Sequence, residues 1–491
     1  MNYKVVLSIL GKAMLIEAAL LLAPFLVGIY FREELYTSFL IPIAILCVLG
    51  VPLSCLRQKD KSIYAKEGFV IVALAWIVLS VVGCIPFIIS GVISDFASAL
   101  FETVSGFTTT GASALDSVEN MPKSIMFWRI LTHWLGGMGV LVFILAILPG
   151  ASAGLMRIFR AESPGPSSGK LVGKMRHTAR ILYGIYIFMT LTEAVLLLFG
   201  GIGLYDSVLT AFSTAGTGGF GVHDGSIGYY STIPQFNGVY IEMVVAVFMF
   251  LFGVNFNVFY LILTGNILKA LKSEELIVYF TIIVVSSVVI ALNILYTLDS
   301  ITNFWQAMRY SFFQVNTVTS TTGFSTANFA EWPALSKGIL LFLTIIGASG
   351  GSTGGGLKVA RLCILVRSAG ADLRRMMYPR SVVTVKFEGK TLPQETERGV
   401  LTFLILYAGI SCLCVLLLSL LNPFDVFDNL SATLACIGNV GPGVTRLVGP
   451  MASYSGYTAG SKLILSFVML AGRLEIFPML ILFAPRTWKK G

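Results

Sequence analysis

Four short stretches rich in threonine and glycine carry the residues of this sequence that could do chemistry. Glycine permits the backbone angles that aim consecutive carbonyl oxygens in one direction, and threonine adds hydroxyl oxygens. Oxygens gathered in this way can replace the hydration shell of a monovalent cation. The four stretches are Thr109-Thr110-Gly111, Thr217-Gly218-Gly219, Thr321-Thr322-Gly323 and Asn439-Val440-Gly441.

The four stretches recur at a regular interval. Their final glycines, which we call the anchors, are 108, 104 and 118 residues apart. Each stretch follows an apolar segment of three to four helical turns, which is too short to span a bilayer. One Thr-Thr-Gly is common in any loop, but a repeat of this length indicates four copies of one unit. We interpret the unit as a span, a short pore helix, a loop and a second span.

The composition is that of a membrane protein. Hydrophobic residues make up 56% of the 491 residues and charged residues only 12%, with a mean hydropathy of +0.85. A soluble domain carries about twice that charged fraction. The seven cysteines lie mostly in apolar runs, so we interpret them as small lipid-facing or core side chains.

Ten apolar stretches are long enough to span a membrane, and the last eight form four pairs around the four loops. The predicted fold is therefore an all-α polytopic membrane protein. It has four repeats around a pseudo-fourfold pore, plus two extra N-terminal transmembrane helices. The predicted spans are 7–29, 37–56, 68–90, 126–148, 180–201, 239–267, 275–297, 336–366, 398–421 and 461–484. The predicted boundaries are 1–66 for the N-terminal helices and 67–160, 161–270, 271–380 and 381–491 for the repeats.

The net charge of +9 is distributed unevenly. Lysine and arginine cluster in alternate connections, whereas the stretch 201–240 contains neither. Positive charge marks the cytoplasmic side, so both termini and the basic loops are predicted to be cytoplasmic. This placement favours a lipid bilayer over nucleic acid as the partner of the charge.

Acidic residues are predicted on the side poor in basic residues, where they would concentrate cations at the mouth of a pore. The negative dipole end of each pore helix would also favour a cation. Asp95, Asp206 and Asp425 could instead cap the starts of helices. The acidic residues are Asp95, Glu102, Asp116, Glu119, Asp206, Asp224, Glu331, Asp425 and Asp428.

A run of glycines interrupts the stretch 336–366. Six of the ten residues in 347–356 are glycine, so helix is poorly supported there and a loop lining the cavity is predicted. A site of close helix packing is the alternative, but packing motifs space glycines by four. We predict a gate that includes Gly347, Gly350, Gly351, Gly354, Gly355 and Gly356.

Arg473 lies within the last predicted span, where an arginine is costly and indicates function. If it faces the pore, it would repel a cation and complete the constriction with the glycine run. A salt bridge to Glu475 is an alternative compatible with this. Lys358 and Arg361 follow the glycine run and are predicted to snorkel to the cytoplasmic surface.

Several longer motifs resemble a known family. They are 127–139 (FWRILTHWLGGMG), 211–214 (AFST), Gly218-Gly219-Phe220 with His223-Asp224, 319–325 (TSTTGFS), 350–358 (GGSTGGGLK) and 472–475 (GRLE). This sequence resembles the superfamily of K⁺ transporters that includes bacterial TrkH, TrkG and KtrB and plant HKT proteins. The two additional N-terminal spans look like those of TrkH rather than KtrB.

The resemblance implies a function for the loops. The four stretches would form a K⁺ selectivity filter, and the glycine run would obstruct the pore and move on activation. The fourth loop, which begins at Asn439, departs from the Thr-Thr-Gly form. In the plant relatives a serine at the first anchor goes with Na⁺ preference, so Gly111 favours K⁺.

The resemblance also implies partners and location. The chain would take up K⁺ across the bacterial plasma membrane as a homodimer, with no covalent cofactor. A TrkA-type cytosolic, nucleotide-binding regulatory ring would dock on the basic loops. The glycine run lacks the lysine spacing and the preceding strand of a nucleotide-binding loop, so ATP hydrolysis is not expected in this chain.

Two other classes of function stay open. A K⁺ symporter coupled to H⁺ or Na⁺ would need a titratable or second ion site, for which Glu193 and His133 are candidates. A membrane enzyme would need a cluster of acid, base or metal-binding groups. His133, His177 and His223 are too scattered for such a cluster, so we do not expect an enzyme.

Overall fold

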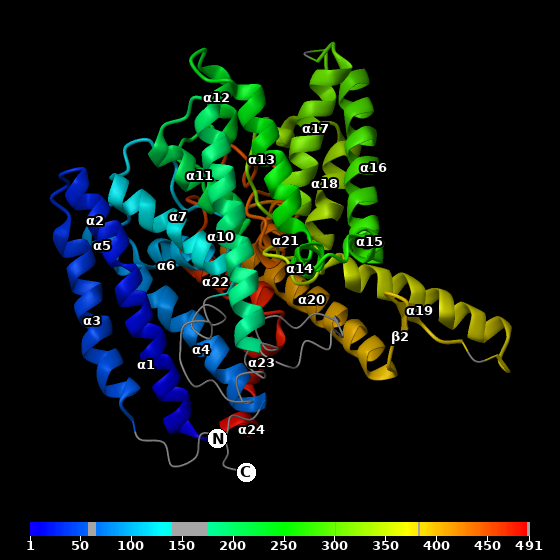
Figure 1. Ribbon diagram of the computed structural model, residues 1–491, viewed down its shortest axis with the longest axis horizontal. Helices are drawn as coiled ribbons and strands as arrows, with labels where there is room; N and C mark the ends of the chain where they lie inside the picture. The colour runs from blue at the N-terminus through cyan, green and yellow to red at the C-terminus, as the bar shows by residue number, and fades with distance from the viewer. Residues whose placement is uncertain (57–64, 140–174, 300, 382, 489–491) are drawn as a thin grey trace.

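The computed structural model describes residues 1–56, 65–139, 175–299, 301–381 and 383–488, which form a bundle of helices (Figure 1). Within these residues the strands are the two-residue β1 (Lys386–Phe387) and β2 (Lys390–Thr391), which pair antiparallel as a small hairpin. This architecture confirms the predicted all-α membrane fold.

Two N-terminal spans precede the repeats. The first consists of α1 (Tyr3–Leu20) and α2 (Leu22–Tyr30), and the second is α3 (Tyr36–Ser54). Helices α1 and α3 meet at Gly11 and Gly50, where a Cβ on Gly11 would lie 2.8 Å from the Gly50 carbonyl oxygen. Glycine is therefore needed at this crossing.

Each following unit contains an outer helix, a pore helix and a second helix. The outer helices are α4 (Ala65–Gly83), continued by α5 (Ile85–Ile89), then α10 (Met175–Phe199), α16 (Glu274–Thr297) and α20 (Gln394–Leu421). The pore helices are α6 (Phe96–Phe107), α11 (Leu204–Gly216), α17 (Phe304–Thr319) and α21 (Val426–Ile437). The second helices are α7 (Lys123–Gly137), α13 (Gly238–Gly253), α18 (Ala334–Ile346) and α22 (Ala459–Arg473). The boundaries proposed from the sequence for the four repeats stay a prediction.

The remaining helices are short or peripheral. They are α12 (Tyr229–Thr232), α14 (Phe256–Leu263), α15 (Ile267–Leu271), α19 (Val359–Met377), α23 (Phe477–Phe483) and α24 (Pro485–Trp488). Two single turns of 3₁₀ helix, Ser226–Gly228 and Phe329–Glu331, lie in connections.

The second helices differ from the expectation of unbroken spans. Among the described residues, six helices are long and apolar enough to cross a membrane, and all six are N-terminal or outer helices. A seventh span would combine α13 and α14, which meet at a 90° bend. The predicted spans 239–267 and 461–484 are thus each broken, as was expected only for 336–366. Part of the span predicted at 126–148 lies outside the described residues.

The close approach of α7 and α22 to their neighbours accounts for where these two second helices end. A Cβ on Gly136 would lie 2.0 Å from the Phe107 carbonyl oxygen, and one on Gly472 would lie 2.1 Å from that of Ile437. These two helices therefore press against the ends of pore helices α6 and α21 and stop within one residue of the contact. The break after α22 includes positive φ angles at Glu475 and Ile476.

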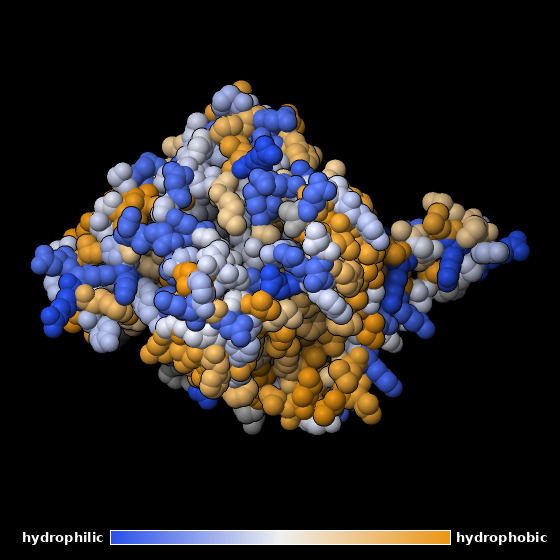
Figure 2. All heavy atoms as spheres, turned by 90° about the horizontal axis from the view of Figure 1, so that it is seen from above, coloured by the Kyte–Doolittle hydropathy of each residue, from blue (hydrophilic) through white to orange (hydrophobic). Residues whose placement is uncertain are grey.

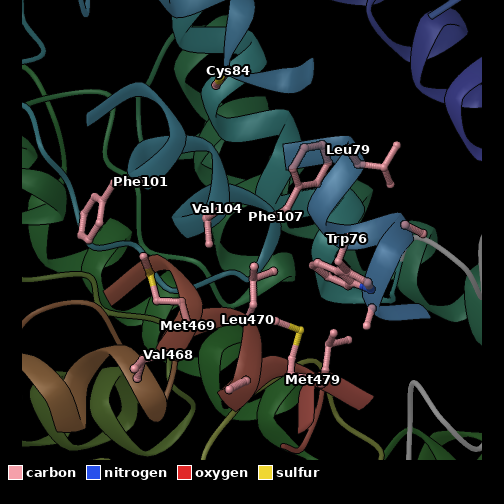
Figure 3. Packing of buried hydrophobic residues seen from close by; sticks show 14 of the residues in the cluster. Trp76, Leu79, Cys84, Phe101, Val104, Phe107, Val468, Met469, Leu470 and Met479 are labelled. Carbon is pink, nitrogen blue, oxygen red and sulfur yellow. The ribbon is translucent and has the colours of Figure 1, made fainter. Parts of the chain in front are cut away.

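The largest hydrophobic core joins the N-terminal helices to the first and fourth repeats. In Figure 3, Trp76 of α4 and Phe107 of α6 lie near Leu470 of α22 and Met479 of α23. These residues are almost fully buried. The first and last repeats are therefore adjacent, as closure of a fourfold arrangement requires.

The outer surface of the bundle is apolar. Figure 2 shows continuous hydrophobic areas on the flank of the molecule, with polar residues gathered over the face seen from above. Large exposed hydrophobic residues occur on the outer helices, including Phe188 and Leu191 of α10 and Leu416 and Leu420 of α20. Lipid would cover such a surface in a spanning protein.

The start of α1 and the last described helix, α24, lie together at the lower end of the molecule in Figure 1. The Tyr3 hydroxyl donates a hydrogen bond of 2.6 Å to the Trp488 carbonyl. Both termini therefore lie on one side of the bundle. That this side is cytoplasmic stays a prediction.

Replacing Gly11 with valine should destabilise the N-terminal pair of helices. The added side chain would push α1 away from Leu53 and Ser54 of α3, and overpacking of this kind costs about 1–3 kcal/mol. The melting temperature of the purified protein in detergent should fall. Gly184→Val is the matched control, since nothing lies within 4 Å of a Cβ there. Equal melting temperatures for both variants would contradict the crossing.

Candidate ion pathway

The four loops adopt the same backbone conformation. Thr109, Thr217, Thr321 and Asn439 have positive φ angles of 55°, 53°, 60° and 54°. The anchors Gly111, Gly219, Gly323 and Gly441 have φ angles of 77°, 81°, 87° and 92°. The left-handed region is costly for side chains other than glycine, so its recurrence in four loops indicates one shared geometry.

Each pore helix ends in the same hydrogen bond. The amide before the anchor donates to a carbonyl of the last helical turn, as in Thr110 to Ser105 at 2.8 Å and Gly218 to Ser213 at 2.9 Å. Thr322 donates to Thr317 and Val440 to Ala435 in the same way. This bond satisfies the helix end and turns the chain sharply. The carbonyls of the loop are left outside the helical ladder.

The anchors close a ring of four loops. A Cβ on Gly111 would lie 2.0 Å from the carbonyl oxygen of Gly218, and one on Gly219 would lie 2.0 Å from that of Thr322. A Cβ on Gly323 would lie 2.3 Å from the Val440 carbonyl oxygen, and one on Gly441 would lie 2.4 Å from that of Thr110. Each anchor thus abuts the carbonyl of the residue before the next anchor. The order first, second, third, fourth and back to the first encloses one axis.

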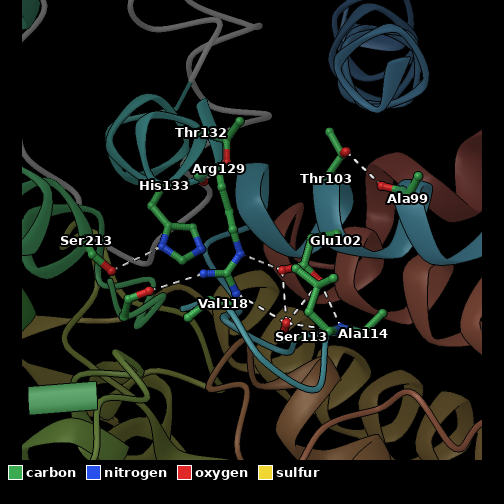
Figure 4. Close-up of polar contacts among 12 residues, drawn as sticks. Ala99, Glu102, Thr103, Ser113, Ala114, Val118, Arg129, Thr132, His133 and Ser213 are labelled. Carbon is green, nitrogen blue, oxygen red and sulfur yellow. Dashed lines mark hydrogen bonds and ion pairs between the residues drawn. The ribbon is translucent and has the colours of Figure 1, made fainter. Parts of the chain in front are cut away.

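A buried ion pair supports the first two loops. Arg129, 3% exposed, donates to Glu102 at 2.7 Å and lies over the Phe220 ring at 3.5 Å. His133 stacks on Phe220, with ring centroids 4.1 Å apart, and its Nδ1 lies 3.3 Å from the Ser213 hydroxyl. Figure 4 shows Arg129 reaching from α7 to Glu102 and Ser113. These contacts fix loops one and two to each other.

The Asn439 side chain gives the divergent fourth loop a role of its own. Its amide donates to the Thr110 hydroxyl and to the Met469 carbonyl, both at 3.0 Å. It thereby joins the fourth loop to the first loop and to α22. The sequence did not reveal this contact, although the change from threonine to asparagine was its visible sign.

A cavity of about 500 Å³ lies next to the ring and is lined by all four anchors. Asp116 and Asp224 also line this cavity. Asp116 accepts hydrogen bonds from two serine hydroxyls, and Asp224 accepts one from Ser117. Carboxylates beside a polar cavity would attract cations toward the ring.

The other acidic residues differ in their roles. Glu102 is fully buried in its pair with Arg129, so it does not line the mouth as expected. Asp95 accepts from the Ser98 amide at 2.9 Å, so it caps α6. Asp206 lies in the first turn of α11 and faces His223, and Asp425 precedes α21 without a side-chain capping bond.

The glycine run forms a loop directly against the ring. The Gly355 amide donates to the Thr321 hydroxyl at 2.7 Å. A Cβ on Gly354 would lie 2.8 Å from the Ser320 carbonyl oxygen, and one on Gly355 would lie 2.5 Å from that of Gly438. Glycine is therefore needed for the loop to reach the ends of the third and fourth pore helices.

Arg473 ties this loop to the opposite side of the bundle. Its guanidinium donates to the Thr353 carbonyl at 2.6 Å, and to those of Gly136 at 2.6 Å and Gly137 at 2.8 Å. The arginine thus connects the loop of the third repeat to α7 of the first. Glu475 forms its ion pair with Arg361.

Two basic residues after the loop differ from prediction. Lys358 is 8% exposed and Arg361 is 6% exposed, so neither reaches the surface as a snorkelling side chain would. Lys358 donates to the Gly354 carbonyl and Arg361 pairs with Glu475. The nearby carbonyl and carboxylate oxygens offset the cost of burying these charges.

The candidates for other chemistry do not come together. Glu193 on α10 and His133 on α7 are both fully buried, and neither lines the cavity beside the ring. Across the described residues, no group of three or more His, Cys, Asp or Glu side chains could hold a metal ion. The side chain of His177 lies outside the described residues.

Comparisons with known proteins agree with this architecture. A family model described as TrkH, cation transport protein, matches residues 37–490. The chain belongs to the TrkH family of cation transport proteins. It is therefore a multi-pass membrane transporter and not an enzyme, which confirms the resemblance found in the sequence.

Individual relatives match over their full length. The chain is 32% identical over 498 residues to the Trk system potassium uptake protein TrkH of Escherichia coli K12 and 34% identical over 495 residues to that of Vibrio parahaemolyticus. Each alignment covers 100% of both chains. The crystal structure of the potassium transporter TrkH from Vibrio parahaemolyticus matches with a TM-score of 0.88, at 32% identity and full coverage of both chains.

The loop that follows the second filter stretch contains His223, which should make the protein's stability depend on pH. His223 lies 3.2 Å from Glu119 and 3.5 Å from Asp206, and stacks on Tyr229. Burial by itself lowers the pKa of His223, but hydrogen bonds to Asp206 and Glu119 and their charges raise it above its ordinary value of 6.5. The stabilisation is fully present below about pH 6.5 and is lost as the pH rises through the raised value.

The melting temperature should therefore fall as the pH rises from about 6.5 through the raised pKa, and His223→Gln should flatten that part of the profile. Glu331→Gln, an exposed acid on another segment, is the matched control. A profile for His223→Gln that follows the unmodified protein would show that this contact does not contribute.

Proposed function

We propose that this chain takes up K⁺ across the bacterial plasma membrane through the ring of four loops. The observation that carries the proposal is the closed order of contacts between anchor glycines and neighbouring carbonyls. Oxygens held around one axis can replace the hydration shell that a cation loses on entering the path. The names of the relatives, which are potassium uptake proteins, support K⁺ as the transported ion.

The proposed filter consists of the twelve loop residues predicted from the sequence. The loop 347–356 and Arg473 would form the gate, since the loop lies against the ring and the arginine holds it to the opposite repeat. A guanidinium beside the path also opposes a cation electrostatically. Movement of the loop would open the path.

The proposed regulation comes from a cytosolic partner. A TrkA-type, nucleotide-binding ring would dock on the basic loops, with both termini cytoplasmic and the transporter acting as a homodimer. Support comes from the Trk system named for the relatives and from the two termini lying together. Coupled symport with H⁺ or Na⁺ is less favoured, because neither Glu193 nor His133 is among the residues that line the cavity shared by the anchors.

Substituting the first anchor should change ion selectivity. A serine at Gly111 would place its Cβ against the Gly218 carbonyl and would widen or tilt the ring. We expect the ratio of K⁺ to Na⁺ flux in proteoliposomes to fall towards parity. Gly91→Ser is the matched control, because Gly91 also has a positive φ of 75° but has nothing within 4 Å. Unaltered selectivity in Gly111→Ser would refute the filter.

Removing the arginine should open the path. Arg473→Ala deletes three charge-assisted hydrogen bonds, each worth about 1.5–3 kcal/mol, so the flux of K⁺ without a cytosolic partner should rise about tenfold or more. Arg446→Ala, at an exposed arginine in the loop after the fourth anchor, serves as the control. If Arg473→Ala and the control leak equally, the arginine is not part of a gate.

A further inference from the structure

Besides its contacts with the ring and with Arg473, the glycine loop is hydrogen-bonded to a buried carboxylate. Glu275, in the first turn of α16, is 5% exposed. One of its oxygens accepts from the Gly350 amide at 2.6 Å, and the other accepts from the Asn255 side-chain amide at 3.2 Å. A single carboxylate therefore joins the loop to the second repeat.

Asn255 marks the 90° bend between α13 and α14, and this bend also binds the loop through the backbone. The Phe256 amide donates to the Gly351 carbonyl, and the Ser349 amide donates to the Gly253 carbonyl, both at 3.1 Å. The loop residues on either side of Gly350, which bonds Glu275, are thus both hydrogen-bonded to the bend. The second half is bonded to the ring and Arg473.

A chain of contacts leads from Glu275 to the surface at the side of the termini. Glu388, in the turn between β1 and β2, accepts from the Ser273 hydroxyl at 2.8 Å and from the Glu275 amide at 3.2 Å. It therefore caps the start of α16. Glu274 accepts from the Glu388 amide at 3.0 Å and from Arg367 of α19 at 2.8 Å.

The position of the hairpin allows it to be moved from outside. Lys386, Glu388 and Lys390 are exposed, and the hairpin lies with α19 at the edge of the molecule in Figure 1. Displacing Glu388 would uncap α16 at the residue whose side chain holds the loop. The start of α16 therefore connects the hairpin, through Glu388, to the glycine loop, through Glu275.

The physical need for such a residue follows from the loop's composition. Glycine loses more conformational freedom on ordering than any other residue, so a loop with six glycines in ten residues has little intrinsic preference for one shape. An ionised carboxylate that accepts from a backbone amide makes a bond about twice as strong as a neutral one. Glu275 can therefore decide whether the first half of the loop stays in place.

We propose that Glu275 is the positioning residue that holds the glycine loop closed and that Glu388 of the hairpin controls it from the surface. The proposal rests on the proposed role of the loop as a gate. It adds the connection by which a change at the cytosolic surface would reach that gate.

The test measures K⁺ flux into proteoliposomes without any cytosolic partner. Glu275→Ala should raise the flux about tenfold or more, because it removes the acceptor of a charged hydrogen bond. Glu275→Gln keeps an acceptor oxygen for the Gly350 amide and should stay within about threefold of the unmodified protein, since only the charge assistance is lost. Rescue by glutamine separates positioning from a general loss of stability.

Glu388→Ala should raise the flux by a few-fold, because it loosens the start of α16 without touching the loop. Glu395→Ala, an exposed acid in the first turn of α20, is the matched control and should leave the flux unchanged. Gel filtration and melting curves establish that each variant is folded. If Glu275→Ala is not folded, Glu388→Ala alone decides the matter, and an unchanged flux overturns the proposal.

The result separates this inference from the gate itself. If Arg473→Ala raises the flux and Glu275→Ala does not, the gate stands and the role of Glu275 is refuted. A lower flux in folded Glu275→Ala refutes it as well. If neither variant changes the flux, the glycine loop is not the gate.

Discussion

The contact on which the rest of this structure depends is that between each anchor glycine and the carbonyl of the next loop. Non-helical backbone at membrane depth needs either protein or water as its partner. Four loops meet closely enough that no Cβ fits between them, and their carbonyls remain free of the helical ladder. Each of the four pore helices is followed by the same left-handed turn, which brings its loop into this contact.

The same need for close approach shapes the second helices. Gly136 and Gly472 let α7 and α22 reach the ends of pore helices, and each helix ends within one residue of that contact. The C-terminal end of α7 presents carbonyl oxygens, and Arg473 donates to two of them, those of Gly136 and Gly137. The end of α7 thus supplies acceptors for Arg473, which in turn bonds the glycine loop at Thr353.

Buried charges organise the regions on both sides of the ring. Arg129 with Glu102 braces the first two loops, and Arg361 with Glu475 lies beside the glycine loop. Each charge has its counterion or carbonyl acceptors within hydrogen-bond distance, which offsets part of the desolvation cost. Such pairs are poor sources of stability but define one arrangement, because removing one partner leaves a buried charge uncompensated.

The sequence alone determined the membrane class, the fourfold repeat, the anchor glycines and the break at 347–356, because each of these is a local pattern of hydropathy or glycine. Only the tertiary structure decided the breaks in α13 and α22, the burial of Lys358 and the partners of Glu275, Asn439 and Arg473. Arg473 and its Gly136 acceptor are 337 residues apart, and Asn439 and Thr110 are 329 apart. A side chain's type shows that it needs a partner, but the folding of distant repeats around one axis determines which partner it meets.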